Sequence, residues 1–90
     1  MKSKIQVGKF CYKTGRADSL DKHHIMNGAY RAKSEKYGLW VWLHHDVHMW
    51  LHQTPDGAKY ARELKKTAQR IFEEEHSRAE WMALFKKNYL

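Results

Sequence analysis

Histidines are concentrated in one short stretch, residues 44–53, and an adjacent pair, His23 and His24, precedes it. If the stretch is helical, His48 and His52 stand four residues apart and project from one face of the helix. That spacing lets one helix give two nitrogens to one metal ion. A strand that carries His23 and His24 would add a third nitrogen and leave one imidazole for acid–base chemistry.

The spacing of the histidines alone does not establish a metal-binding site. Two histidines at helical spacing often occur by accident. Neighbours on a regular strand also point to opposite faces, so His23 and His24 can serve one site only if the strand end is twisted or bulged. Metal binding and accidental spacing therefore both stay open on this pattern.

Two strands must position the histidine pair. Residues 19–26 form one strand candidate, closed by the turn dipeptide Asn27-Gly28. Residues 38–43 are a continuous β-branched and aromatic run, the strongest strand signal in the chain. We expect these two strands to pair, with the intervening basic residues 28–37 as a loop or short irregular helix.

The flanking segments predict further elements. Residues 5–10 alternate apolar and polar side chains, which predicts a half-buried strand before a tight turn at residues 12–15. Thr54 and Pro55 supply an N-cap and a first-turn proline for a long helix to about His76. Its apolar positions recur at three- and four-residue steps: Ala61, Leu64, Ala68, Ile71 and Phe72.

A last helix is predicted after Ser77, because residues 77–80 have the form of a capping box. Its apolar stripe consists of Trp81, Leu84 and Phe85. We interpret this helix and the long one before it as scaffold, and we assign Trp40 and Trp42 to the core instead of to base stacking.

Composition restricts the class of protein. Ninety residues, 42% hydrophobic and 30% charged, indicate one small folded domain. Because the chain has no apolar run of membrane-spanning length, no apolar signal-peptide core and a single cysteine, Cys11, we expect a cytoplasmic protein without a membrane partner.

The net charge of +7 is unevenly spread. Residues 1–43 hold nine Lys or Arg against three acids, and residues 44–90 hold eight against seven. A basic half is expected if it meets phosphates, and equally if it is only a solvated surface.

The order of these elements resembles that of the HNH nucleases, which have the ββα-metal fold. It consists of a strand with two histidines, a loop, a second strand and a helix with His48 and His52. Small phage and prophage HNH proteins are more similar still. They contain sequence segments similar to three segments of this chain: Asp21-Lys22-His23-His24-Ile25, residues 31–39 and Lys87-Asn88-Tyr89-Leu90. The resemblance covers nearly the whole chain from Cys11 onward.

This resemblance implies an α+β fold: a small β-hairpin plus helix, followed by two C-terminal helices. One domain, residues 1–90, would hold a ββα-metal core at about residues 5–53 and helical support at residues 55–90. The implied function is a metal-dependent endonuclease that hydrolyses DNA phosphodiester bonds, leaving a 5′-phosphate and a 3′-hydroxyl. The implied partners are DNA and a phage or host DNA-processing protein, in a bacterial or phage-infected cell.

The resemblance also implies residue roles. One divalent cation (Mg²⁺, Mn²⁺, Ni²⁺ or Zn²⁺) would be held by three imidazoles, those of His23, His48 and His52. His24 would act as general base on the attacking water. The DNA backbone would be held by three basic residues of the loop, Arg31, Lys33 and Lys36.

The sequence departs from the family's pattern in three places. Related proteins often hold a structural zinc where this chain has Cys11, Thr14, His44 and Val47, and we expect no such zinc because a closed site needs four ligands. The central asparagine of the HNH name is not found before Leu39, and Asn27 is the nearest candidate orienting residue. Tyr30 stands where close relatives have asparagine.

Two other functions stay open. One is a catalytically degraded HNH-fold protein that binds DNA or serves as a scaffold, and the other is a histidine-rich metal-binding protein without a nucleic-acid role. His44 is either the remnant of the lost zinc site or a hydrogen-bonded histidine near the helix start. We expect His45 to be exposed.

Overall fold

The computed structural model describes all residues 1–90, and a two-stranded antiparallel hairpin lies at its centre. Strand β1 (Leu20–His24) pairs with β2 (Trp40–His44) so that His23 stands opposite Val41. The predicted α+β class and the predicted strand pair are confirmed. The remaining elements are η1 (Gly28–Tyr30), α1 (Arg31–Lys36), α2 (His45–Gln53), α3 (Pro55–Glu75) and α4 (Arg78–Phe85).

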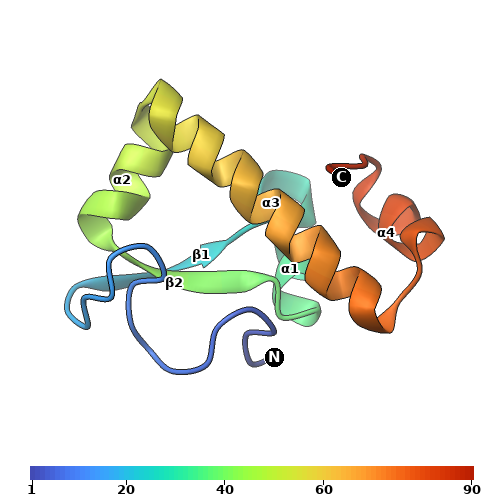
Figure 1. The fold of residues 1–90 in the computed structure, drawn as a ribbon, viewed down its shortest axis with the longest axis horizontal. Helices are drawn as coiled ribbons and strands as arrows, with labels where there is room; N and C mark the ends of the chain where they lie inside the picture. The colour runs from blue at the N-terminus through green and yellow to red at the C-terminus, as the bar shows by residue number, and fades with distance from the viewer.

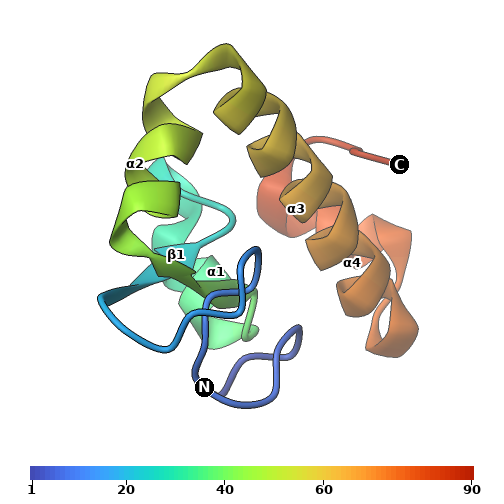
Figure 2. The same ribbon diagram turned by 60° about the vertical axis from the view of Figure 1, so that its left-hand side comes forward.

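The two faces of the hairpin meet different parts of the chain. Helices α2 and α3 lie over one face, and the N-terminal segment runs along the other side (Figure 1). Figure 2 shows α4 beside the C-terminal half of α3, away from α2. Strand alternation places Asp21 and His23 on the face with buried Val41 and Leu43, and it places Lys22 and His24 on the other.

The predicted strand at residues 5–10 is wrong, because a side chain replaces the backbone ladder there. Gln6 Oε1 accepts the N–H of Trp42 at 2.9 Å, and the Gln6 amide donates to the carbonyl of Phe10. Gly8 has φ +90°, which L-residues rarely adopt, and Val7 is 94% exposed. The segment is thus a looped strap whose amide satisfies the edge of β2.

Helix ends follow the predicted capping. Thr54 Oγ1 accepts the N–H of Gly57 at 2.9 Å at the start of α3. Ser77 Oγ accepts the N–H of Glu80 at 3.1 Å, and Glu80 Oε1 accepts the N–H of Ser77 at 3.0 Å. The capping box is therefore confirmed, as are the short helix after β1 and the turn at residues 12–15.

The core joins the hairpin to the helices. It is one cluster of twelve buried residues: Cys11, Ile25, Met26, Leu39, Val41, Leu43, Leu51, Leu64, Ala68, Phe72, Trp81 and Phe85. The predicted buried face of α3 is largely confirmed, with Ala61 and Ile71 only partly covered. Trp40 is buried as expected, whereas Trp42 is half-buried, with Lys9 Nζ 4.6 Å from its ring centre.

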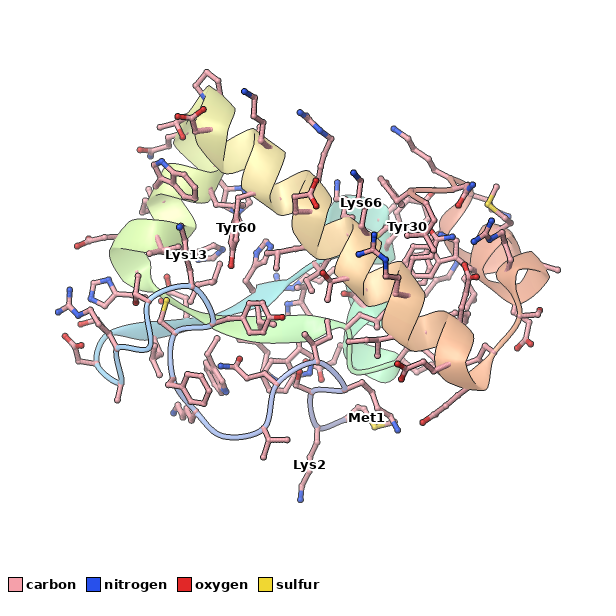
Figure 3. The ribbon with its side chains drawn as sticks, in the orientation of Figure 1. Met1, Lys2, Lys13, Tyr30, Tyr60 and Lys66 are labelled. Carbon is pink, nitrogen blue, oxygen red and sulfur yellow. The ribbon has the colours of Figure 1, made fainter.

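The N-terminal strap also contacts α3. In Figure 3, Tyr60 points from α3 toward the loop that carries Lys13, whose Nζ lies 5.3 Å from the Tyr60 ring centre. Burial raises the pKa of Tyr60 to about 12. None of the helices combines the length and the apolar composition needed to cross a bilayer.

Candidate metal centre

Three imidazoles from two elements meet between the hairpin and α2. His23 comes from β1, and His48 and His52 come from one face of α2. One nitrogen from each ring lies within 4.8 Å of the others, and the Nε2 atoms of His48 and His52 are 3.3 Å apart. Two nitrogens bound at about 2.05 Å to one tetrahedral ion would also lie about 3.3 Å apart. The predicted ligands are thus brought together, with His48 and His52 at the separation of two ligands of one ion and His23 within 4.8 Å of them.

The histidine cluster (His23, His48 and His52) is suited to a cation because two of its rings, the buried His23 and the exposed His52, favour the neutral form. Burial, aided by the neighbouring His48 and His52, lowers the pKa of His23 to about 3. Burial and His48 likewise lower the pKa of His52. A neutral imidazole keeps the lone pair that a metal ion requires, so protons compete weakly at these two rings near neutral pH.

Asp21 orients one ligand of the cluster. The Nδ1–H of His48 donates to Asp21 Oδ2 at 3.0 Å, and the Nδ1–H of His45 donates to the same oxygen at 2.9 Å. These hydrogen bonds, that of His48 first, lower the pKa of Asp21. With its proton on Nδ1, neutral His48 presents the Nε2 lone pair toward His52.

Asp21 was not among the residues expected to contribute, although a local signal existed. It precedes His23 by two positions on β1, so both side chains point from the same face of the strand. An acidic residue at that offset from a ligand is a natural second partner for the site.

His24 lies across the strand from the cluster. The ladder stays regular up to His24 opposite Trp40, so no bulge turns both rings to one face and alternation separates His24 from His23. The Nε2–H of His24 donates to Glu35 Oε1 at 3.0 Å, and Lys22 Nζ donates to the same oxygen at 3.1 Å.

Glu35 gives His24 a defined tautomer. The hydrogen bond from His24, followed by that from Lys22, lowers the pKa of Glu35 to about 2. An ionised carboxylate on Nε2–H leaves Nδ1 of neutral His24 as a proton acceptor. Glu35 comes from α1 and gave no signal in the sequence, because only the packing of α1 on β1 brings it to His24.

The three residues expected to hold DNA lie on α1 and do not border the cluster. Lys33 Nζ donates to the carbonyl of Leu84 at 3.2 Å, near the end of α4. Lys36 lines a separate pocket beside Tyr37, and Arg31 is exposed. Their role as DNA contacts stays a prediction.

A pocket of about 250 Å³ opens beside His23 and His52. Asn27, the candidate orienting residue, lines it, and so do Arg62 and Lys65 of α3. We expected α3 to be scaffold only, and the sequence did not point to these two cations as part of a site. Helical periodicity groups them on one face, but only the angle at which α3 leaves α2 turns that face toward the histidines.

Two of the four positions at which HNH proteins often hold a structural zinc, Cys11 and Thr14, are in contact. Cys11 Sγ accepts the backbone N–H of Thr14 at 3.4 Å. His44 Nδ1 accepts the N–H of Asp46 at 3.1 Å, which confirms a hydrogen-bonded histidine at the start of α2. His45 is exposed, as expected.

Comparisons with protein-family models, curated proteins and solved structures found no match to this chain. Three imidazole nitrogens suit Zn²⁺, Ni²⁺ and related ions, and they leave coordination positions for water or a substrate oxygen.

Proposed function

We propose that the protein is an HNH-type, metal-dependent endonuclease that hydrolyses phosphodiester bonds of DNA. The observation that carries the proposal is the histidine cluster, with two Nε2 atoms 3.3 Å apart and a third imidazole within 4.8 Å. A three-nitrogen set is typical of catalytic metal sites, because structural sites are closed by a fourth protein ligand. The net charge of +7 supports a polyanionic substrate.

The chain's own residues take three roles. His23, His48 and His52 hold the cation, and Asp21 holds His48 in the tautomer that can bind it. When bound, the cation acts as a Lewis acid that neutralises charge on the phosphate and stabilises the leaving oxygen.

His24 is the proposed general base. Its Nδ1 takes a proton from the water that attacks phosphorus, while Glu35 holds its Nε2–H. The bond from phosphorus to the 3′ oxygen breaks, and that oxygen takes a proton from solvent water, which leaves a 5′-phosphate and a 3′-hydroxyl.

The proposal requires the scissile phosphate to lie at the end of β1. His24 is the last residue of that strand, and the cluster begins at the preceding residue on the opposite face. Beyond the strand end the chain turns at Gly28, with φ +60°. A phosphate at that end can approach both faces, whereas one above the middle of the strand would meet only one of them.

The test is nicking of supercoiled plasmid at low salt with Mg²⁺, Mn²⁺, Ni²⁺ or Zn²⁺, together with the metal affinity of each variant. We expect His48→Ala to lose both metal binding and cleavage. His24→Ala should keep metal affinity and lose cleavage by about 10²–10⁴-fold, the usual contribution of a general base. His76→Ala, in a histidine at the far end of α3, is the control and should keep both.

A wild-type protein that binds the plasmid and the metals without cutting would contradict the enzyme. That result would favour the catalytically degraded, DNA-binding alternative.

A further inference from the structure

We infer that Arg62 and Lys65 of α3, with Asn27, form a phosphate-binding subsite in the pocket beside the histidine cluster. The subsite would hold a backbone phosphate next to the one that is cut, and in this respect it rests on the proposed function. It assigns substrate contact to a helix that otherwise serves as scaffold.

The pocket is built by one face of α3. Ala58, Ala61, Arg62 and Lys65 line it, at the three- and four-residue steps that align side chains along a helix. Because both alanines are small, they leave space between α3 and His52. The 250 Å³ corresponds to about eight water molecules at roughly 30 Å³ each, which is room for a phosphate and part of its sugar.

The charge of the pocket selects an anion. No aspartate or glutamate lines it, whereas two cations and two histidines do. Neither Arg62 nor Lys65 takes part in any ion pair of the structure. The neighbouring Lys66, labelled on α3 in Figure 3, is by contrast paired with Glu63 at 3.2 Å.

The positive charge of Arg62 affects the pKa of Lys65, and the charge of Lys65 affects the pKa of His23 in the cluster. Burial first, and then the charges of Lys87 and Arg62, lower the pKa of Lys65. The charge of Lys65 also contributes to the low pKa of His23. An anion bound between these groups would relieve the repulsion, which gives the pocket a physical reason to prefer phosphate.

The residue types match phosphodiester chemistry. The guanidinium of Arg62 offers a planar fork of donors that can bind two phosphate oxygens at once. Lys65 adds a compact positive charge from the next turn of the helix, and the amide of Asn27, which also lines the pocket, can donate a further hydrogen bond. These donors read no base, so the subsite fixes the position of the strand without sequence preference.

The test uses the full chain in EDTA, so that the binding signal does not depend on a metal or on cleavage. A fluorescent duplex oligodeoxynucleotide is titrated at several salt concentrations with wild type, Arg62→Ala, Lys65→Ala and the double variant. Arg70→Ala is the matched control, because Arg70 is exposed on the same helix and does not line the pocket.

Each single variant should weaken binding about tenfold, and the double variant should reduce the slope of log affinity against log salt by about two. Arg70→Ala should change the slope by less than about half a unit. The affinity for Zn²⁺ should stay the same or rise in Lys65→Ala, because a positive charge near His23 is removed. A residue that only supports the fold would lower metal affinity instead.

Variants that bind DNA as tightly, and with the same salt slope, as Arg70→Ala would overturn the subsite, whether or not the wild type cleaves DNA. A reduced slope in the pocket variants, in a protein that cuts nothing with any metal, would keep the subsite and remove the proposed nuclease.

Discussion

Asp21 determines which nitrogen of His48 is available to a metal ion. Neutral imidazole carries one proton, and the carboxylate of Asp21 holds it on Nδ1 at 3.0 Å. Without that partner His48 would divide between two tautomers and two ring orientations, and only one of them faces His52. The aspartate thus prepares the ligand before the ion arrives.

Replacing Asp21 by alanine should therefore weaken Zn²⁺ and Ni²⁺ binding by about 10–100-fold, the usual loss when the partner of a ligating histidine is removed. The measurement is competition against a chromophoric chelator at neutral pH. His45→Ala is the control, since it removes the other partner of the carboxylate and keeps the bond from His48. Equal metal affinity in both variants would contradict this role of Asp21.

The separate residues of the site were predictable to different degrees. His48 and His52 follow from helical spacing, and a third ligand from the His23-His24 pair follows from the strand that pairs next to that helix, whereas the choice of His23 came from the resemblance to HNH nucleases. Arg62 and Lys65 could not be found in this way. Arginine and lysine are common on solvent-exposed helices. Their place in the site depends on their proximity to His52, which is ten or more positions away in sequence.

At the scale of elements, capping residues predicted the ends of helices more reliably than alternating side chains predicted a strand. The caps at Thr54 and Ser77 were predictable because a hydroxyl three residues before an unpaired N–H acts locally. Residues 5–10 alternate as a strand would, yet the amide of Gln6 binds β2 where a backbone ladder was expected. An apolar pattern records which side chains are covered, and it does not record which groups make the hydrogen bonds.

The angle between α2 and α3 depends on Gly57. A Cβ atom at this position would lie 2.1 Å from the carbonyl oxygen of Trp50 and 2.6 Å from Cα of Leu51. Only a glycine lets the two helices approach so closely, directly after the turn at Thr54. The same approach brings the face with Arg62 and Lys65 toward His52.

Gly57→Ala should consequently destabilise the protein, although alanine usually stabilises a helix interior by about 1 kcal/mol over glycine. Overpacking against rigid backbone should cost about 1–3 kcal/mol and should weaken DNA binding by moving α3. Urea unfolding followed by circular dichroism measures the loss, and the EDTA titration described above measures the second effect.

Ala58→Gly is the control for helix propensity at the next residue, and it should cost about 1 kcal/mol without a clash. If Gly57→Ala proved as stable as the wild type, the close approach of α2 and α3 would not constrain the site.

For the whole molecule, the chain separates two chemical environments by one strand. The face of β1 with Asp21 and His23 meets the helices and the cation-lined pocket, and the face with Lys22 and His24 meets Glu35 of α1. The class of fold was predictable because strand and helix patterns are local, and the ligand set was predictable because the paired strands place His23 next to the helix that carries His48 and His52. How α1 and α3 close over the two faces depends on the packing of the entire core, which no local pattern contains.

A buried neutral histidine makes the stability of such a small domain sensitive to acid. His23 is 4% exposed and has a pKa of about 3, while an unfolded histidine has a pKa near 6.5. Between these values the unfolded chain binds more protons, so the free energy of unfolding falls as pH decreases from 6.5 toward 3. Glu35, with a pKa of about 2, acts in the same direction only once the pH falls below its unfolded value near 4.5.

In metal-free protein, we therefore expect the free energy of unfolding to fall between about pH 6.5 and 5, by at most about 1.4 kcal/mol per pH unit for each depressed histidine. His23→Gln should flatten this dependence, because the group that would take up the proton is gone. His45→Gln, at an exposed ring, should leave it unchanged. Urea unfolding in EDTA at several pH values measures the slopes. An unaltered slope in His23→Gln would mean that the fold does not hold this imidazole neutral. Burial would then not explain why His23 could bind a cation near neutral pH.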